Sequence, residues 1–112
     1  MQEKRKSKRE NLIYHPAVYD AHSNKLIGNI VNISTGGFKV ITKNQMKQGK
    51  EYVLCINLPE ETYGSKSVKV KASVRWCGKN TDPGLFHSGC NFVQIVALEK
   101  LHLAALMSAY GS

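Results

Sequence analysis

Two arginines near the start of this chain have the type and spacing that suit binding of an anionic ligand. Arg5 and Arg9 stand four residues apart ahead of the first predicted strand, and they are two of only three arginines in a chain with thirteen lysines. The planar guanidinium fork of Arg binds phosphate oxygens in pairs, recognises guanine edges and stacks on bases, whereas Lys offers only a point charge. Arginine at these two positions is therefore informative about the ligand.

A second candidate group is the hexapeptide Asn32-Ile33-Ser34-Thr35-Gly36-Gly37, which lies between two apolar runs of strand length, Leu26–Val31 and Phe38–Ile41. Two adjacent glycines allow a turn with positive φ and leave a loop open to close approach by a ligand. Asn32 and Ser34 add short side chains that either cap the turn or present donors and acceptors outward. By itself the hexapeptide favours an ordinary hairpin turn over a binding loop.

The two groups together resemble the paired motifs of the PilZ domain family, whose members are bacterial receptors for cyclic di-GMP. Here the motifs read Arg5-Lys6-Ser7-Lys8-Arg9 and Asn32-x-Ser34-x-x-Gly37. Their order and separation are much more specific than either motif alone. The likeness continues through a strand that ends at Trp76, then Gly89-x-x-Phe92, then a C-terminal helix. The first position of the second motif is Asn where many members have Asp, so a neutral acceptor replaces a charged one.

The resemblance implies six ligand-binding residues for cyclic di-GMP: Arg5, Arg9, Asn32, Ser34, Gly36 and Gly37. The arginines would hold phosphate and guanine edges from the arm side, the two polar residues would contact the ligand from the loop, and the glycines would let the backbone approach. The implied function is a bacterial cyclic di-GMP receptor or adaptor that orders its N-terminal arm over the ligand and signals to a partner protein.

Length and composition are those of one small domain. We expect a flexible basic arm over residues 1–10 and a single domain over residues 11–112, because 112 residues with 42% hydrophobic content suit one compact core. No apolar run reaches the length of about 18 residues that a membrane span needs, and the charged N-terminus lacks an apolar leader region. Three cysteines leave an odd thiol under any pairing scheme, which favours reduced cysteines and a cytoplasmic location.

Alternation of apolar and polar residues predicts six strands and therefore an all-β fold. The clearest strand is Val68–Trp76, with one face toward a core and one toward water; on this pattern Trp76 is expected in the core rather than as an exposed stacking platform. The other predicted strands are Asn11–Tyr19, Lys25–Ile33, Phe38–Thr42, Tyr52–Leu58 and Leu85–Val93. Six strands with short turns predict a small antiparallel β-barrel, the architecture that the PilZ resemblance also implies, followed by a C-terminal α-helix.

The predicted helix covers Val96–Tyr110, which lacks Gly and Pro and is rich in Leu and Ala. Its apolar residues form two stripes, one with Leu103 and Leu106 and one with Leu98 and Leu101. A helix that is apolar on several sides is usually covered on several sides. The second stripe is therefore expected to meet a partner protein or a second subunit in a homodimer, or else a groove of its own barrel, and the two alternatives have equal weight.

The residues argue against catalysis. The four histidines lack zinc-ligand spacing, and the chain has neither a recognisable Ser/His/Asp arrangement nor a phosphate-binding Gly-x-x-x-x-Gly-Lys loop. We expect no enzyme, no metal and no cofactor. The net charge of +8 fits an anionic partner. The alternative function is a small basic β-barrel that binds single-stranded nucleic acid; it is less favoured, because such barrels expose aromatic residues and most aromatics here fall on predicted core faces.

Overall fold

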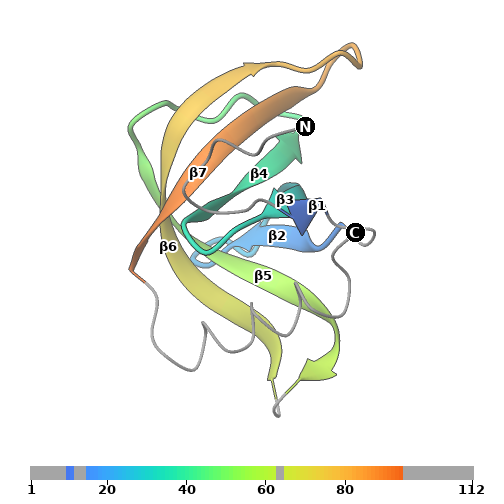
Figure 1. Ribbon diagram of the computed structural model, residues 1–112, viewed down its shortest axis with the longest axis vertical. Helices are drawn as coiled ribbons and strands as arrows, with labels where there is room; N and C mark the ends of the chain where they lie inside the picture. Colours follow the sequence, from blue (N-terminus) through green and yellow to red (C-terminus); the bar gives the residue numbers. More distant parts are fainter. Residues whose placement is uncertain (1–9, 12–14, 63–64, 95–112) are drawn as a thin grey trace.

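Strand pairing in the computed structural model closes an antiparallel β-barrel (Figure 1). The structure describes residues 10–11, 15–62 and 65–94. Within them, six strands follow the order β2-β3-β4-β7-β6-β5, and β5 pairs with β2 to complete the barrel, while the short β1 pairs with β3. The strands are β1 (Glu10–Asn11), β2 (Ala17–Asp20), β3 (Leu26–Ile33), β4 (Gly37–Thr42), β5 (Glu51–Thr62), β6 (Ser65–Lys79) and β7 (Phe86–Gln94).

The predicted six-stranded barrel is confirmed, with one change at its start. The predicted strand Asn11–Tyr19 is not continuous: β1 and β2 are separate, and Pro16 directly precedes β2. Proline has no backbone N–H to donate to a sheet, so it stands at a strand end. The predicted helix over residues 96–110 and the predicted arm lie outside the described residues, except that Glu10 belongs to β1. Within the described part of the chain, no helix is long and apolar enough to cross a membrane.

The barrel interior is filled by the apolar residues that alternate along the strands. Buried side chains from every strand of the barrel contribute, and the largest are Phe38, Ile30, Ile33, Leu54 and Ile56. Burial of each such side chain contributes about 1.5–3 kcal/mol relative to exposure. Cys90 of β7 belongs to the same core, and its burial raises the pKa of the thiol to about 12, so it stays protonated at neutral pH.

At Gly37, the last residue of the loop motif, the backbone of β4 lies very close to the backbone of β7. Gly37 pairs with Asn91, and a Cβ atom added at Gly37 would overlap the backbone carbonyl oxygen of Cys90. The next residue, Phe38, places its ring 5.4 Å from the ring of Phe92. Glycine at position 37 is therefore needed for the packing of the wall.

A pair of glycine substitutions tests this contact. Gly37→Ala should lower the free energy of unfolding by at least about 2 kcal/mol, because β4 and β7 must move apart. Gly36→Ala is the matched control: nothing lies within 4 Å of a Cβ atom there, so stability should change by less than about 1 kcal/mol. Urea unfolding of both variants measures the difference, and equal effects would contradict the close approach.

Candidate functional site

One row of residues runs across four strands on the outer face of the barrel and includes the first residue of the loop motif. Asn32 of β3 pairs with Lys39 of β4, Lys39 pairs with Gly89 of β7, and Gly89 pairs with Trp76 of β6. Asn11 of β1 extends the row, because it pairs with Asn32. Directly paired residues point to the same side of a sheet, and the neighbours of Lys39 along β4 are buried, so this row faces outward. We call Asn32, Lys39, Gly89 and Trp76 the outer row.

Two β-bulges place the ends of the outer row. Between Ile30 and Asn32 the register of β3 against β4 shifts, which leaves Val31 as an extra residue. The register of β6 against β7 shifts in the same way between Val74 and Trp76. An extra residue in one strand turns the following side chain to the opposite face. Without these bulges, Asn32 and Trp76 would point into the core.

The expectation that Trp76 lies in the core is wrong. Its side chain is 40% exposed, since the bulge before it interrupts the strict alternation that the sequence suggests. The indole lies over Gly89, where an added Cβ atom would overlap Nε1. The ring of His87 meets it edge-on, with centroids 5.1 Å apart and planes at 83°. An exposed indole supported from below and from one edge is a platform on which a planar group can stack.

Ser34 and the two glycines form a tight loop at the end of the outer row. The backbone N–H of Ser34 donates to the carbonyl oxygen of Gly37 at 2.8 Å, and the Ser34 hydroxyl accepts the N–H of Gly36 at 3.3 Å. Ser34 is only 6% exposed, so its side chain caps the turn rather than pointing outward. Neither glycine uses the positive φ that glycine allows: the described glycines with positive φ are Gly49 and Gly84. Instead, Gly37 permits the close approach to β7, and Gly36 leaves open space beside the loop.

Asn32 carries a polar atom that lacks a partner. Its Oδ1 atom is buried, and no donor within the described part of the chain reaches it. A buried acceptor left without a donor costs about 1–3 kcal/mol. The outer row therefore contains a buried acceptor for which the described residues supply no donor.

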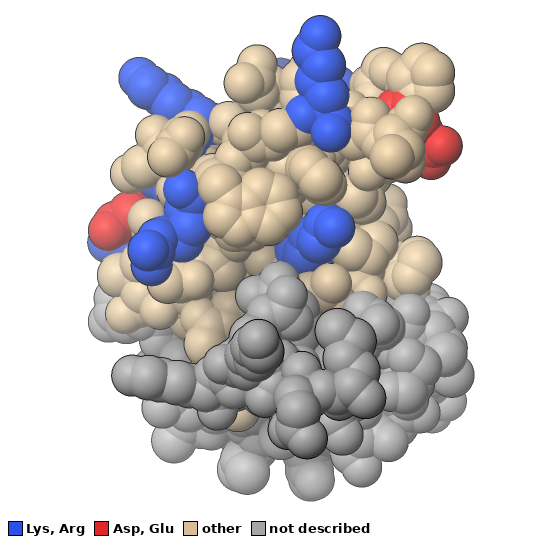
Figure 2. All heavy atoms as spheres, turned by 45° about the horizontal axis from the view of Figure 1, so that its top comes forward, with Lys and Arg blue, Asp and Glu red and all other residues tan. Residues whose placement is uncertain are grey.

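The charge of the described surface suits an anion. On the face shown in Figure 2, Lys and Arg side chains outnumber those of Asp and Glu among the described residues. Lys39 lies in the outer row itself, and Arg75, the extra residue of the second bulge, is exposed beside Trp76. No group of three His, Cys, Asp or Glu residues that could hold a metal ion occurs within the described residues. The arrangement offers cations, an acceptor and an aromatic face, which together suit a planar anionic molecule.

Arg5 and Arg9 lie outside the described residues, but Glu10 and Asn11, which follow Arg9 directly, are described. Glu10 pairs with Ile33 and Asn11 pairs with Asn32. The segment immediately after the first motif therefore forms a sheet with the strand that carries the second motif. This pairing brings the two parts of the chain together at the outer row.

A family model for the PilZ domain matches residues 3–109 of the chain. The chain belongs to the PilZ domain family. A comparison with curated proteins gave no match. The resemblance predicted from the two motifs is thus confirmed, and the match extends over both motifs.

Solved structures of PilZ proteins share the fold. The PilZ domain of YcgR from Escherichia coli, solved with c-di-GMP, is 11% identical with a TM-score of 0.73, and the match covers 96% of this chain and 92% of that one. The Bacillus subtilis inhibitor of motility, MotI/DgrA, is 20% identical with a TM-score of 0.71, and the match covers 97% and 50%. The c-di-GMP complex of MrkH from K. pneumoniae is 17% identical with a TM-score of 0.68, covering 97% and 54%. This PilZ domain therefore spans about half the length of MotI/DgrA and MrkH.

Lys39, Gly89 and Trp76 are the outer-row residues that sequence reasoning did not place in the site. Lys39 is one of many lysines, and its position between buried Phe38 and Val40 indicates only that it points outward. Trp76 fits a core pattern until the register with β7 is known. The one signal in the sequence was the type of Trp76 itself, the sole tryptophan.

The support of Trp76 by Gly89 is testable through tryptophan fluorescence. Gly89→Ala should lift the indole from the sheet, because the added methyl group needs the space that Nε1 now occupies. The expected result is a red shift of the emission maximum and stronger quenching by acrylamide. Gly36→Ala, which has no neighbour to displace, should leave both unchanged. An unchanged spectrum in Gly89→Ala would contradict the placement of the ring.

Proposed function

We propose that this PilZ domain is a receptor for cyclic di-GMP, which binds across the outer row between the N-terminal arm and the loop of residues 32–37. The observation that carries the proposal is the pairing of β1 with β3, because Asn11 lies opposite Asn32. Arg9, the last residue of the first motif, is separated from Asn11 by Glu10 alone. The solved complexes of YcgR and MrkH with c-di-GMP, which share the fold, support the same ligand.

Each part of the ligand has a chemical counterpart in the proposed site. Cyclic di-GMP presents two phosphodiesters and two guanines, and the forks of Arg5 and Arg9 suit both. The unpaired Oδ1 of Asn32 would accept a hydrogen bond from a guanine N–H donor. Lys39 would contribute charge toward a phosphate, and the exposed indole of Trp76 would stack on a base.

The loop residues have a supporting role in this proposal. The Ser34 side chain is buried and bonded within the turn, so it would act by fixing the loop in shape. Gly36 leaves open space into which the ligand backbone could come close. Gly37 would act through the packing of β4 against β7. The proposed site thus combines direct contacts with residues that hold them in place.

The energetics of the arm require both arginines. Ordering the five residues Arg5 to Arg9 would cost roughly 5–10 kcal/mol in backbone entropy, at about 1–2 kcal/mol per residue. A single Arg–guanine contact contributes only about 1–3 kcal/mol. One arginine cannot offset the cost, so both must engage together with contacts from the outer row.

Substitutions in the arm test this cooperation by calorimetry. Arg5→Ala and Arg9→Ala should each nearly abolish binding of cyclic di-GMP, and the double variant should lose little more. Arg9→Lys should also bind at least about tenfold more weakly, because it keeps the charge and loses the fork. Lys8→Ala is the matched control and should bind like the parent chain. If Arg9→Lys binds as tightly as the parent chain, the arm acts only through its charge.

Substitutions on the barrel wall test the outer row separately from the arm. Trp76→Ala should weaken binding by about tenfold, because stacking on an aromatic ring contributes about 1–3 kcal/mol per base. Lys39→Gln should weaken binding less and should reduce its dependence on salt. Lys69→Gln on β6 is the control, since Lys69 pairs with Cys55 of β5, away from the outer row. Wild-type affinity in both outer-row variants would place the ligand elsewhere.

The exposed Trp76 in a basic surface also suits single-stranded nucleic acid. A salt titration separates the two functions. Nucleic-acid binding should fall steeply with salt because counterions are released from many phosphates, while cyclic di-GMP has only two phosphodiesters and should show a shallow dependence. Tight binding to oligonucleotides and none to the cyclic dinucleotide would favour the nucleic-acid function.

The proposal includes a partner protein that binds the domain once its ligand is in place. A receptor that binds a nucleotide without catalysis has an effect only if another molecule binds the nucleotide-bound form with a different affinity from the free form. Affinity purification with and without cyclic di-GMP tests this step. Recovery of the same proteins in equal amounts under both conditions would contradict it.

A further inference from the structure

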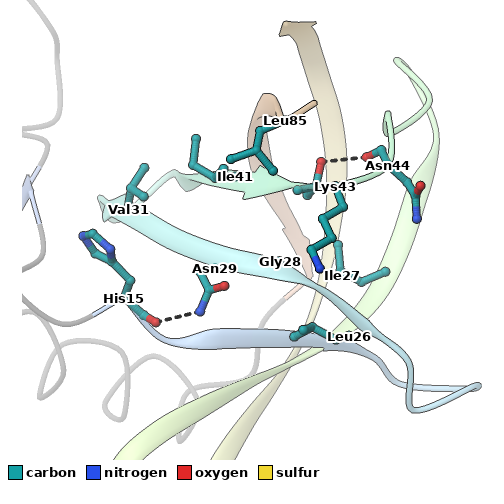
Figure 3. A pocket seen from close by; sticks show the side chains of 11 residues that line it. His15, Leu26, Ile27, Gly28, Asn29, Val31, Ile41, Lys43, Asn44 and Leu85 are labelled. Atoms are coloured by element: carbon teal, nitrogen blue, oxygen red, sulfur yellow. Dashed lines mark hydrogen bonds between the residues drawn. The ribbon is translucent and has the colours of Figure 1, made fainter. Parts of the chain in front are cut away.

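A groove on the outer face of β3 and β4 lies beside the outer row and takes no part in the proposed nucleotide site. Its volume is about 450 Å³. Five of its eleven lining residues are aliphatic and come from segments far apart in the sequence, as Figure 3 shows: Leu26, Ile27, Val31, Ile41 and Leu85. Leu26 at its edge is 57% exposed, the largest exposed fraction among the large hydrophobic residues of the described chain. Contiguous apolar surface that stays exposed is a common feature of interaction sites.

Two polar side chains that line the groove already have hydrogen-bond partners. The side-chain amide of Asn29 donates to the carbonyl oxygen of His15 at 3.0 Å, and the hydroxyl of Thr42 donates to the carbonyl oxygen of Asn44 at 2.6 Å. Figure 3 shows both bonds beside the groove. Lys43 also lines the groove and is exposed, and no ion pair with another described residue neutralises it.

The charge of the groove is one-sided. Lys43 is its charged lining residue, and the lining contains no Asp or Glu. The whole chain carries 16 basic and 8 acidic residues, and this net positive charge also favours an acidic partner. A carboxylate brought next to Lys43 would gain an ion pair at the exposed edge of the groove.

The shape argues for a protein segment as the occupant. Small-molecule sites bury most of their ligand, whereas this groove has exposed residues along its edge, including Leu26, Asn29, Lys43 and Asn44. An aliphatic side chain inserted among Leu26, Ile41 and Leu85 would cover the apolar surface, and the rest of the segment would remain at the rim. Such an anchor with a polar rim is the usual pattern of a protein–protein contact.

We propose that this groove is a docking surface for a partner protein that presents a large aliphatic residue next to an Asp or Glu. The aliphatic side chain enters between Leu26 and Ile41, and the carboxylate pairs with Lys43. The docking surface does not require a bound nucleotide. It adjoins the proposed nucleotide site, because Val31, the extra residue of the bulge that orients Asn32, lines the groove.

The test uses a phage-displayed library of random 12-residue peptides, selected on the full chain without nucleotide. Peptides that also bind the variant Leu26→Glu/Lys43→Glu are removed. The expected consensus is a Leu or Ile beside an Asp or Glu. A synthetic consensus peptide should bind Leu26→Ser and Lys43→Glu about tenfold more weakly than the parent chain, and Lys69→Glu, the control on β6, with unchanged affinity. Circular dichroism confirms that each variant is folded.

A charge exchange makes the test specific for the proposed ion pair. Replacing the consensus carboxylate by Lys should weaken binding to the parent chain and restore binding to Lys43→Glu. The proposal is overturned if no peptide is enriched, if the consensus lacks a carboxylate, or if Leu26→Ser and Lys43→Glu leave the affinity unchanged. Because no nucleotide is present, these outcomes do not depend on whether the domain binds cyclic di-GMP.

Discussion

The candidate site depends on two extra residues, Val31 in β3 and Arg75 in β6, that shift the register of their strands. In a regular strand, a residue two positions from a buried one is buried too. The bulges break this rule at the two ends of one row, so Asn32 and Trp76 both face outward with Lys39 and Gly89 between them. β-Bulges are common next to binding sites because they turn one side chain without changing the sheet around it.

The barrel makes this row rigid. In its wall β4 pairs with β7, and Gly37 allows the two backbones to approach closely there. Phe38 of β4 packs on Phe92 of β7. The loop of residues 32–37 is fixed at both ends, since Ser34 bonds to Gly37 and the N–H of Phe92 donates to the carbonyl oxygen of Gly36 at 2.9 Å. A site on strands and a bonded loop needs little rearrangement when a ligand arrives.

The sequence predicted the barrel because its strands alternate clearly and its turns are short. It also predicted where the loop motif stands, between two strands of the wall. Three features were not accessible. The bulges leave the apolar–polar pattern unchanged, so Trp76 appeared to belong to the core although 40% of it is exposed. The backbone contact that requires Gly37 depends on the distance between β4 and β7, and the sequence left open whether Ser34 bonds within the turn or points outward. Lys39 became part of the site only through its pairing with Asn32 and Gly89.

The central claim is that cyclic di-GMP binds across the outer row, and an NMR titration of the labelled chain tests it most directly. Asn32 and Trp76 provide the probes, because the side-chain amide of one and the indole N–H of the other give resolved signals at opposite ends of the row. We expect both signals, and the backbone signals of Lys39 and Gly89, to shift with cyclic di-GMP and not with linear pGpG at the same concentration. Saturating cyclic di-GMP that leaves all four residues unshifted, or that shifts a different face of the barrel, would contradict the account.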